Sequence, residues 1–127
     1  MVLVSPPLAD ILELKSEKNA EINRSRATAN SSSFTHGGKT FSCDALSRSD
    51  IDGVNGFVAL NDALPPSFPG AWKATDNTLL PLSDVSAWKA FYGALVATGS
   101  ANFAHSQQLK TALAEATTAE EVAAIVW

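Results

Sequence analysis

The sequence is poor in the residues from which metal and thiol sites are built. It contains one cysteine, Cys43, and two histidines, His36 and His105, among 127 residues. A single cysteine cannot form an internal disulfide, so the fold does not require an oxidising compartment. A zinc site usually needs four nitrogen or sulfur ligands, at least two of them closely spaced, and this chain does not supply them. We therefore expect no metal and no cofactor.

The chain also lacks a long hydrophobic run and an excess of positive charge. No apolar run approaches the roughly 20 residues of a transmembrane helix. Residues 1–14 have no basic region, and Pro6, Pro7 and Asp10 interrupt their apolar residues, which argues against a signal peptide. The formal net charge is −4, and the nine basic residues are spread along the sequence. We expect a soluble protein that does not insert into membranes and does not bind nucleic acid.

Hydrophobic residues make up 46% of the chain, which is enough for one core at this length. We predict a single compact α+β domain over residues 15–127, preceded by an apolar N-terminal attachment segment over residues 1–14. A long helix should begin after Ser5, where two prolines suit the first turn, and should end near Asn30.

Apolar residues crowd the start of this helix and become sparse later. Two interpretations are open for them. The crowded residues could contact another protein chain, or they could fold back onto the core of their own domain. The candidate contact residues are Leu3, Leu8, Ile11 and Leu12.

A β-hairpin is predicted near residues 34–43, because Gly37 and Gly38 tolerate the positive φ angles of a tight turn. Gly37 and Gly38 followed by Lys39 and Thr40 also resemble the end of a phosphate-binding loop. The motif also requires an earlier glycine, separated from Gly38 by four residues, and Ser33 stands at that position. The turn is therefore the favoured interpretation.

Two further strands are predicted near residues 72–82, on either side of a turn at Asp76 and Asn77. Pro81 cannot donate a ladder hydrogen bond, so the second strand should end there or lie at a sheet edge. We expect these strands to join the hairpin near residues 34–43 in one small antiparallel sheet.

A middle helix should follow the hairpin near residues 34–43, with Asp44 or Ser47 as its N-cap. Gly53 and Gly56 weaken a helix interior, and we expect them to mark close helix packing. This helix carries the apolar residues Leu46, Ile51, Val54, Val58 and Leu60.

A long C-terminal helix is predicted to begin at a Ser83 cap. A short helix should follow it, because Thr117 and Thr118 each have a glutamate three residues later in the capping-box pattern. We expect Trp127 to pack on the body of the domain or on a neighbouring chain. The apolar stripe of the long helix comprises Val85, Trp88, Tyr92, Leu95, Gly99, Phe103, Leu109 and Leu113.

Between the middle and long helices, residues 64–70 contain three prolines and are predicted to form an ordered loop. Phe68 and Trp72 are a second candidate contact patch, since aromatic residues are enriched at interface hot spots. A core role for both residues under the loop is the favoured alternative.

No arrangement of polar residues indicates catalysis. Cys43 is expected to be a small buried hydrophobe next to Phe41 and not a nucleophile. Asp50 and Asp52 lack the alternating carboxylates and terminal glutamate of a calcium loop. We therefore do not expect an enzyme.

A series of residues between positions 15 and 127 resembles, in type and in order along the sequence, a known group of proteins. The matching positions include Lys18, Glu21, Ile22, Arg26, Phe34, Gly38, Lys39, Phe41, Asp44, Ser47, Arg48, Ile51, Gly53, Trp72, Asp76, Asn77, Leu82, Leu109, Lys110, Ala116, Thr117, Thr118, Glu121 and Ile125. In this order the chain resembles an uncharacterised domain family found in or beside phage and prophage tail-fibre and tail-fibre-assembly genes. It departs from that family at Cys43, where a small polar residue is usual, and in the proline-rich loop.

The resemblance implies a location and a type of partner, and it implies no catalytic residue. We expect a structural component of a phage tail that contacts tail, baseplate or fibre proteins. A homo-oligomer is expected, with a trimer as one option because tail fibres are threefold. The protein would reside in the virion, and in the host cytoplasm during assembly. The alternatives are a tail-fibre assembly chaperone and a host-receptor or glycan-binding module that uses Trp72, Trp88 or Tyr92.

Overall fold

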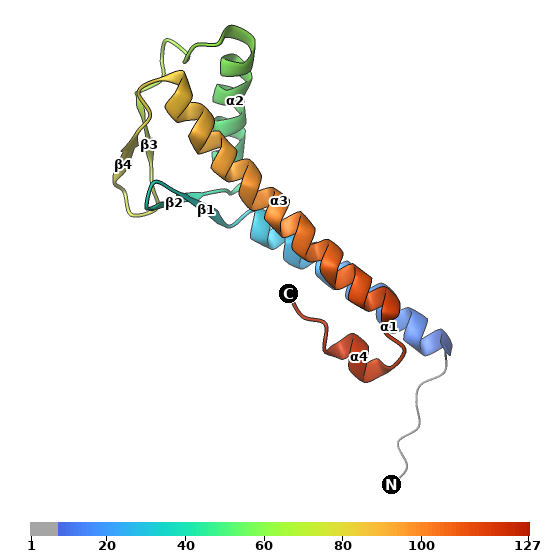
Figure 1. Cartoon of the computed structure of the whole chain (residues 1–127). Helices are drawn as coiled ribbons and strands as arrows, with labels where there is room; N and C mark the ends of the chain where they lie inside the picture. Colours follow the sequence, from blue (N-terminus) through green and yellow to red (C-terminus); the bar gives the residue numbers. More distant parts are fainter. Residues whose placement is uncertain (1–7) are drawn as a thin grey trace. The chain divides into compact units, whose positions relative to one another are not determined.

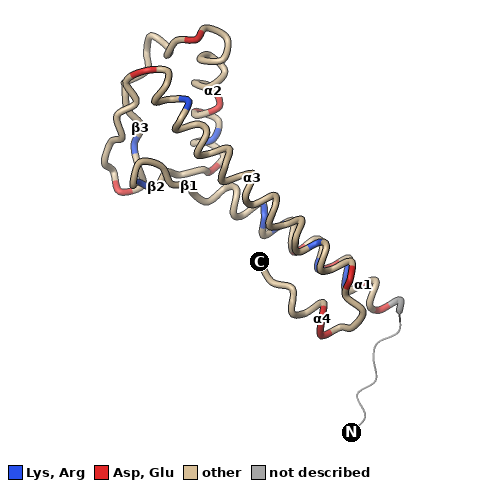
Figure 2. The backbone as a smooth tube through the Cα atoms, viewed as in Figure 1, with Lys and Arg blue, Asp and Glu red and all other residues tan. Residues whose placement is uncertain are grey.

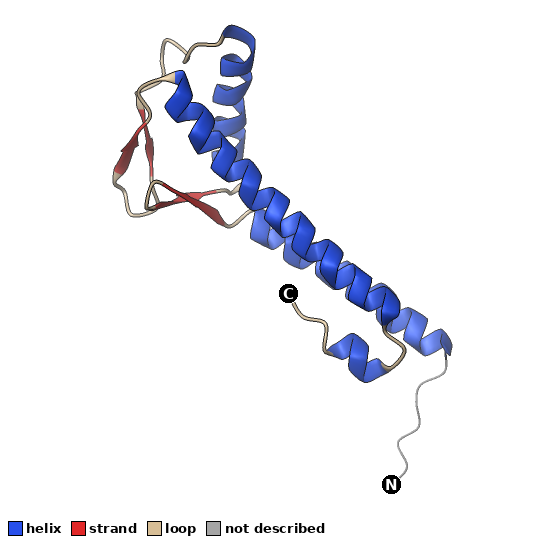
Figure 3. Ribbon diagram, in the orientation of Figure 1, coloured by secondary structure: helices blue, strands red, loops and turns tan. Residues whose placement is uncertain are grey.

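The computed structural model describes residues 8–127, with side chains from residue 10 onward. The predicted α+β fold class is confirmed: an N-terminal helix, two hairpins, a middle helix, a long helix and a short final helix follow one another (Figures 1 and 3). The elements are α1 (Leu8–Asn30), β1 (Ser33–His36), β2 (Lys39–Ser42), α2 (Ala45–Asn61), β3 (Ala71–Lys73), β4 (Leu79–Pro81), α3 (Val85–Glu115) and α4 (Ala119–Ala123).

The chain divides into two compact units. The helical unit combines the chain up to Thr28 with Ala101–Trp127, and the mixed unit comprises Ala29–Ser100. The predicted boundary at residue 14 lies within α1, and the residues before Leu8 lie outside the described part of the chain. A single domain over residues 15–127 stays a prediction, and each unit is described by itself.

In the helical unit, α1 and the end of α3 pack as an antiparallel pair. The Nζ of Lys15 donates to the carbonyl of Ala114 at 3.1 Å. Farther along, the guanidinium of Arg26 lies 4.9 Å from the ring centre of Phe103. Along α1 the contact residues run from Lys15 to Arg26. Along α3 their partners run in the opposite direction, from Ala114 to Phe103, over the same number of residues. This agreement fixes the direction and register of the pair.

A small apolar core joins α4 to this helix pair. It consists of Ile22, Leu113, Ala116, Val122 and Ile125. Burial of a valine, leucine or isoleucine side chain contributes roughly 1.5–3 kcal/mol. These apolar residues therefore account for much of the free energy that holds α4 on the helix pair. The Nζ of Lys18 adds a hydrogen bond to the carbonyl of Ile125 at 2.9 Å.

The start of α4 confirms the predicted capping box in one of its two registers. The Oγ1 of Thr118 accepts from the backbone N–H of Glu121 at 3.1 Å. The carboxylate of Glu121 in turn accepts from the backbone N–H of Thr117 at 3.2 Å. The first bond satisfies an amide that the first turn of a helix leaves without a partner, whereas the second reaches the residue before the cap instead of the cap itself.

The mixed unit is built around packed aromatic rings. Phe34 and Phe41 face each other across the first hairpin, and both contact Phe91 of α3, at centroid distances of 5.2 and 5.0 Å. Trp88 lies 5.4 Å from Phe91, and its indole N–H donates to the Oδ1 of Asn55 at 3.2 Å. The other buried residues of this core are Cys43, Ile51, Val58, Ala74, Leu82 and Leu95.

The hairpin turns form where the sequence predicts them, but the single sheet is wrong. Gly37 and Gly38 have φ angles of +60° and +76°, and Asn77 has +67°. The strands form two separate two-stranded antiparallel sheets, β1–β2 and β3–β4. The backbone N–H of Thr75, beyond the end of β3, donates to the carbonyl of Thr40 in β2 at 2.8 Å. Since β3 has left its ladder with β4 at that point, the bond links the hairpins without merging them.

Helix capping was predicted correctly for α2 but not for α3. Asp44 accepts from the N–H of Ser47 at 2.8 Å, as expected for the N-cap of α2. At α3 the cap is Asp84, which accepts from the N–H of Ala87 at 2.7 Å. The predicted Ser83 cap is therefore one residue too early.

The two glycines of α2 do not mark close packing, which corrects the expectation from the sequence. A methyl group added at Gly53 or Gly56 would have no other atom within 4 Å, apart from its own helix backbone and chain neighbours. Leu46 and Leu60 of the same helix are also exposed. Only Ile51 and Val58 are fully buried along α2.

We predict that Gly53→Ala and Gly56→Ala each stabilise the protein by about 0.5–1 kcal/mol, because alanine lowers the entropy cost of the helix without a clash. Gly37→Ala is the matched contrast. It should destabilise, since φ is positive there and the new methyl would lie 3.0 Å from a Leu80 methyl. Urea unfolding measures all three free energies. A loss of stability at both α2 positions would contradict the open surface.

Candidate partner-binding surfaces

The apolar residues predicted at the start of the chain have different environments. Leu3 lies outside the described residues, and Leu8 is described only as the first residue of α1. Ile11 is 8% exposed and belongs to the interior. Leu12 is 58% exposed on α1 and is available for contact. Ile11 therefore fits the interpretation as a core residue, and contact of Leu12 with another chain stays a prediction.

The end of the chain presents a second set of apolar side chains. The ring of Trp127 packs edge-on against His105 of α3 at 4.6 Å, within the helical unit. It is still 41% exposed, and the neighbouring Val126 is 66% exposed. Phe103 is 48% exposed beneath Arg26. Together with Leu12, these residues are the exposed large hydrophobic side chains among the described residues of the helical unit.

Phe68 and Trp72 are partly buried against the aromatic core of the mixed unit. Their rings stack at 6.4 Å with an interplanar angle of 21°. Both rings also contact Trp88, at 5.6 and 5.8 Å. The geometry gives both residues a role in the core, and Trp72 in addition lines an open hollow.

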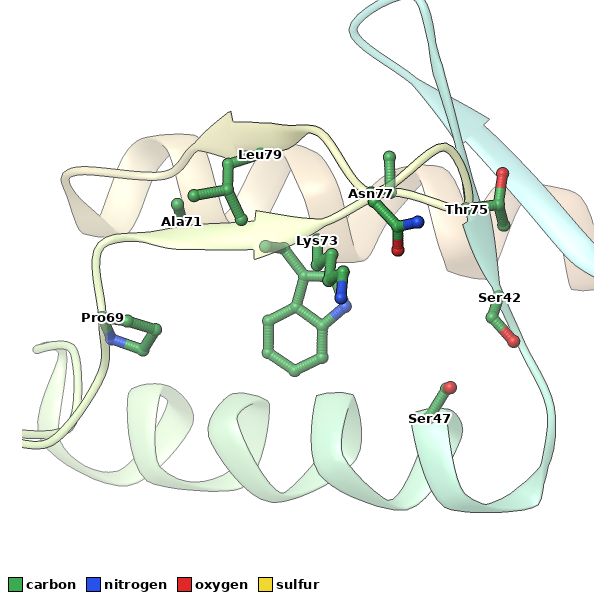
Figure 4. A pocket seen from close by; sticks show the side chains of 10 residues that line it. Ser42, Ser47, Pro69, Ala71, Lys73, Thr75, Asn77 and Leu79 are labelled. Atoms are coloured by element: carbon green, nitrogen blue, oxygen red, sulfur yellow. The ribbon is translucent and has the colours of Figure 1, made fainter.

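This hollow has a volume of about 520 Å³ and lies along β3, within the size range of ligand pockets. Figure 4 shows the strand that carries Ala71 and Lys73 running alongside α2. Pro69 lies at one end of the hollow, and Ser42 and Ser47 lie at the other.

The backbone of β3 presents an unpaired edge to this side. The N–H of Ala74 donates to Thr78 and the carbonyl of Gly70 accepts from Leu82, so these residues point toward β4. In an antiparallel ladder the direction alternates. Ala71 and Lys73 therefore point their N–H and C=O groups away from β4, and no described residue bonds to these outward groups.

The model of a family described as a domain of unknown function, DUF4376, matches residues 13–126. The chain belongs to this family. No curated protein and no solved structure matches it.

The polar residues of this DUF4376 chain tie its elements together. Asp52 of α2 accepts from the Nε of Arg48 and from the hydroxyl of Tyr92 on α3, both at 3.1 Å. Burial raises the pKa of Tyr92 above its ordinary value of 10.0, and the bond to Asp52 adds to this rise. Cys43 is buried nearby, as the sequence predicts.

The described residues contain no group of three or more histidine, cysteine, aspartate or glutamate side chains that could hold a metal ion. None of the helices in the described range is long and apolar enough to span a membrane. Charged residues of both signs are scattered over the helices and loops (Figure 2).

Neither the free edge of β3 nor the central ring of Phe91 was predicted from the sequence. With only three residues, β3 is too short to show an alternating pattern. Phe91 lies three residues after Trp88, and this helical spacing would have placed both on one face. For the strand edge, the available signal was Pro81, which indicates that one side of the second hairpin cannot add a strand.

We predict that the Asp44 cap gives α2 a pH-dependent stability. The N–H of Ser47 holds the pKa of Asp44 below its ordinary value of 3.8. The stabilisation is therefore present above that value and is lost as the pH falls through the lower pKa of the folded state. Asp44→Ala should lower the melting temperature at pH 7, and its difference from wild type should shrink below pH 3.8. Asp44→Asn, a neutral cap, is the control; a pH-independent difference for Asp44→Ala would contradict the assignment.

We also predict that Trp72→Ala destabilises the fold by roughly 3 kcal/mol, because the ring stacks on Phe68 and contacts Trp88. Leu79→Ala removes an exposed side chain from the same hollow and should change the unfolding free energy by less than about 0.5 kcal/mol. Chemical denaturation distinguishes the two. Equal, small effects would show that Trp72 does not support the core.

Proposed function

We propose that this DUF4376 chain is a non-enzymatic structural component of a bacteriophage tail that acts through contacts with other tail, baseplate or fibre proteins. The location is supported by the resemblance to domains encoded in or beside tail-fibre genes. The observation that carries the mode of action is the exposure of large apolar side chains on the helical unit: Leu12, Phe103, Val126 and Trp127.

These side chains suit attachment to a partner protein. Leu12 is more than half exposed on a regular helix, and helices bind partner grooves through apolar anchors of this kind. Trp127 and Phe103 are aromatic, the class that dominates interface hot spots. Arg26 and His105 flank the two rings and supply polar groups beside them.

Glycan recognition through all three proposed aromatic residues does not fit the geometry. Trp88 has no exposed surface, and the hydroxyl of Tyr92 is bonded to Asp52. Only Trp72 lines the hollow. The protein-contact role is therefore the better supported of the two.

The test is a mass-spectrometric analysis of purified particles from the phage or induced prophage that encodes the chain. We expect the protein in particles at a fixed ratio to fibre or baseplate proteins. A chain that is needed for infectivity but absent from finished particles would be an assembly chaperone instead. Absence from particles without any effect on their assembly would refute both roles.

A matched pair of variants tests the surface. Leu12→Gln should reduce incorporation into particles at least several-fold, since it removes an apolar anchor without touching the core. Leu60→Gln is the control, because Leu60 is 86% exposed on α2 of the mixed unit. Circular dichroism confirms that both variants fold. Wild-type incorporation of Leu12→Gln would place the attachment surface elsewhere.

A further inference from the structure

The outer edge of β3 and the open hollow beside it form a candidate binding site in the mixed unit. We propose that this edge binds residues 2–4 of a second copy of the chain as an added β-strand. The inference goes beyond the proposed tail role and does not depend on it, since it concerns association of the purified protein with itself.

The backbone groups of β3 select an extended peptide as the occupant. Ala71 and Lys73 each turn an N–H and a C=O outward. Two donors and two acceptors that alternate along a strand edge match the ladder of another strand. Addition of a strand to such an edge is a common mode of peptide recognition.

Only one edge of this hairpin is suited to accept a strand. On the far side of the sheet, Leu79 and Pro81 of β4 occupy the outward-pointing positions. Pro81 has no N–H, so that edge lacks one of its donors. Beyond Lys73, the N–H of Thr75 is already bonded to Thr40 of β2. The acceptor site is therefore limited to the length of β3.

The sequence of residues 1–7 fits this site. Val2, Leu3 and Val4 are uncharged, apolar and favourable in strands. They match the three residues of β3 in number, and Pro6 and Pro7 would end the added strand immediately afterwards. The wall of the hollow offers apolar contacts from Pro69, Trp72 and Leu79.

The experiment uses the full chain and a variant that lacks residues 1–7 but keeps every described residue. Sedimentation velocity measures association, and amide hydrogen exchange by NMR measures protection at Ala71 and Lys73. We expect the full chain to associate and to protect both amides at least 10-fold more than the truncated chain. A synthetic peptide of residues 1–7 should restore the protection.

A pair of proline variants tests the edge itself. Lys73→Pro removes the outward N–H of β3, whereas Leu79→Pro makes the same change on the directly paired residue of β4. Lys73→Pro should abolish association. Leu79→Pro keeps every N–H of β3 and removes one apolar contact of the hollow, so it should weaken association far less than Lys73→Pro does. Lys73→Ala is the control for the lost side chain. Circular dichroism shows that each variant folds.

Three results would overturn the proposal. The first is a monomeric full chain whose Ala71 and Lys73 amides exchange as fast as in the truncated chain. The second is association that persists in a folded Lys73→Pro variant. The third is protection that only an added oligosaccharide produces, which would assign the hollow to a glycan. None of these results bears on incorporation into particles, so the tail role is judged separately.

Discussion

The packing of aromatic rings between the first hairpin and α3 is the interaction on which the mixed unit depends. Phe34 and Phe41 are opposite each other in the ladder, and both meet the ring of Phe91. Because Trp88 joins Phe91 to the second hairpin through Trp72, both sheets are anchored to one helix. Each sheet has only two strands, and an isolated two-stranded hairpin is marginally stable in water. The helix therefore supplies the stability that the sheets lack.

Most of the fold could be predicted from interactions between residues that are close in the sequence. The features that could not be predicted depend on contacts between residues far apart in the sequence. Glycine pairs, asparagine turns and helix caps act over a few residues, so Gly37, Asn77, Asp44 and Thr118 could be assigned from the sequence. The separation of the two sheets depends on where α2 and α3 hold the hairpins, and no short pattern records this. The prediction of close packing at Gly53 was wrong for the same reason, because the open space around this residue is a property of the tertiary structure.

The candidate surfaces were predictable as composition but not as exposure. Ile11 and Leu12 are adjacent and chemically alike, yet one is buried and the other is exposed. Neighbouring residues of a helix point in different directions, so a buried and an exposed position can be adjacent in the sequence. Likewise, Trp72 and Trp88 are equally aromatic in the sequence, but only Trp72 reaches the hollow. Residue type thus identified the candidates, and the surroundings of each residue in the fold distinguished them.

The placement of the three tryptophans gives each unit its own intrinsic fluorescent reporter. Trp72 and Trp88 lie in contact within the mixed unit, whereas Trp127 belongs to the helical unit and is partly open to solvent. A water-borne quencher such as acrylamide reaches Trp127 far more readily than the buried Trp88. Tryptophan fluorescence can therefore follow the thermal unfolding of the two units separately. One shared transition or two distinct transitions will show whether the units unfold cooperatively.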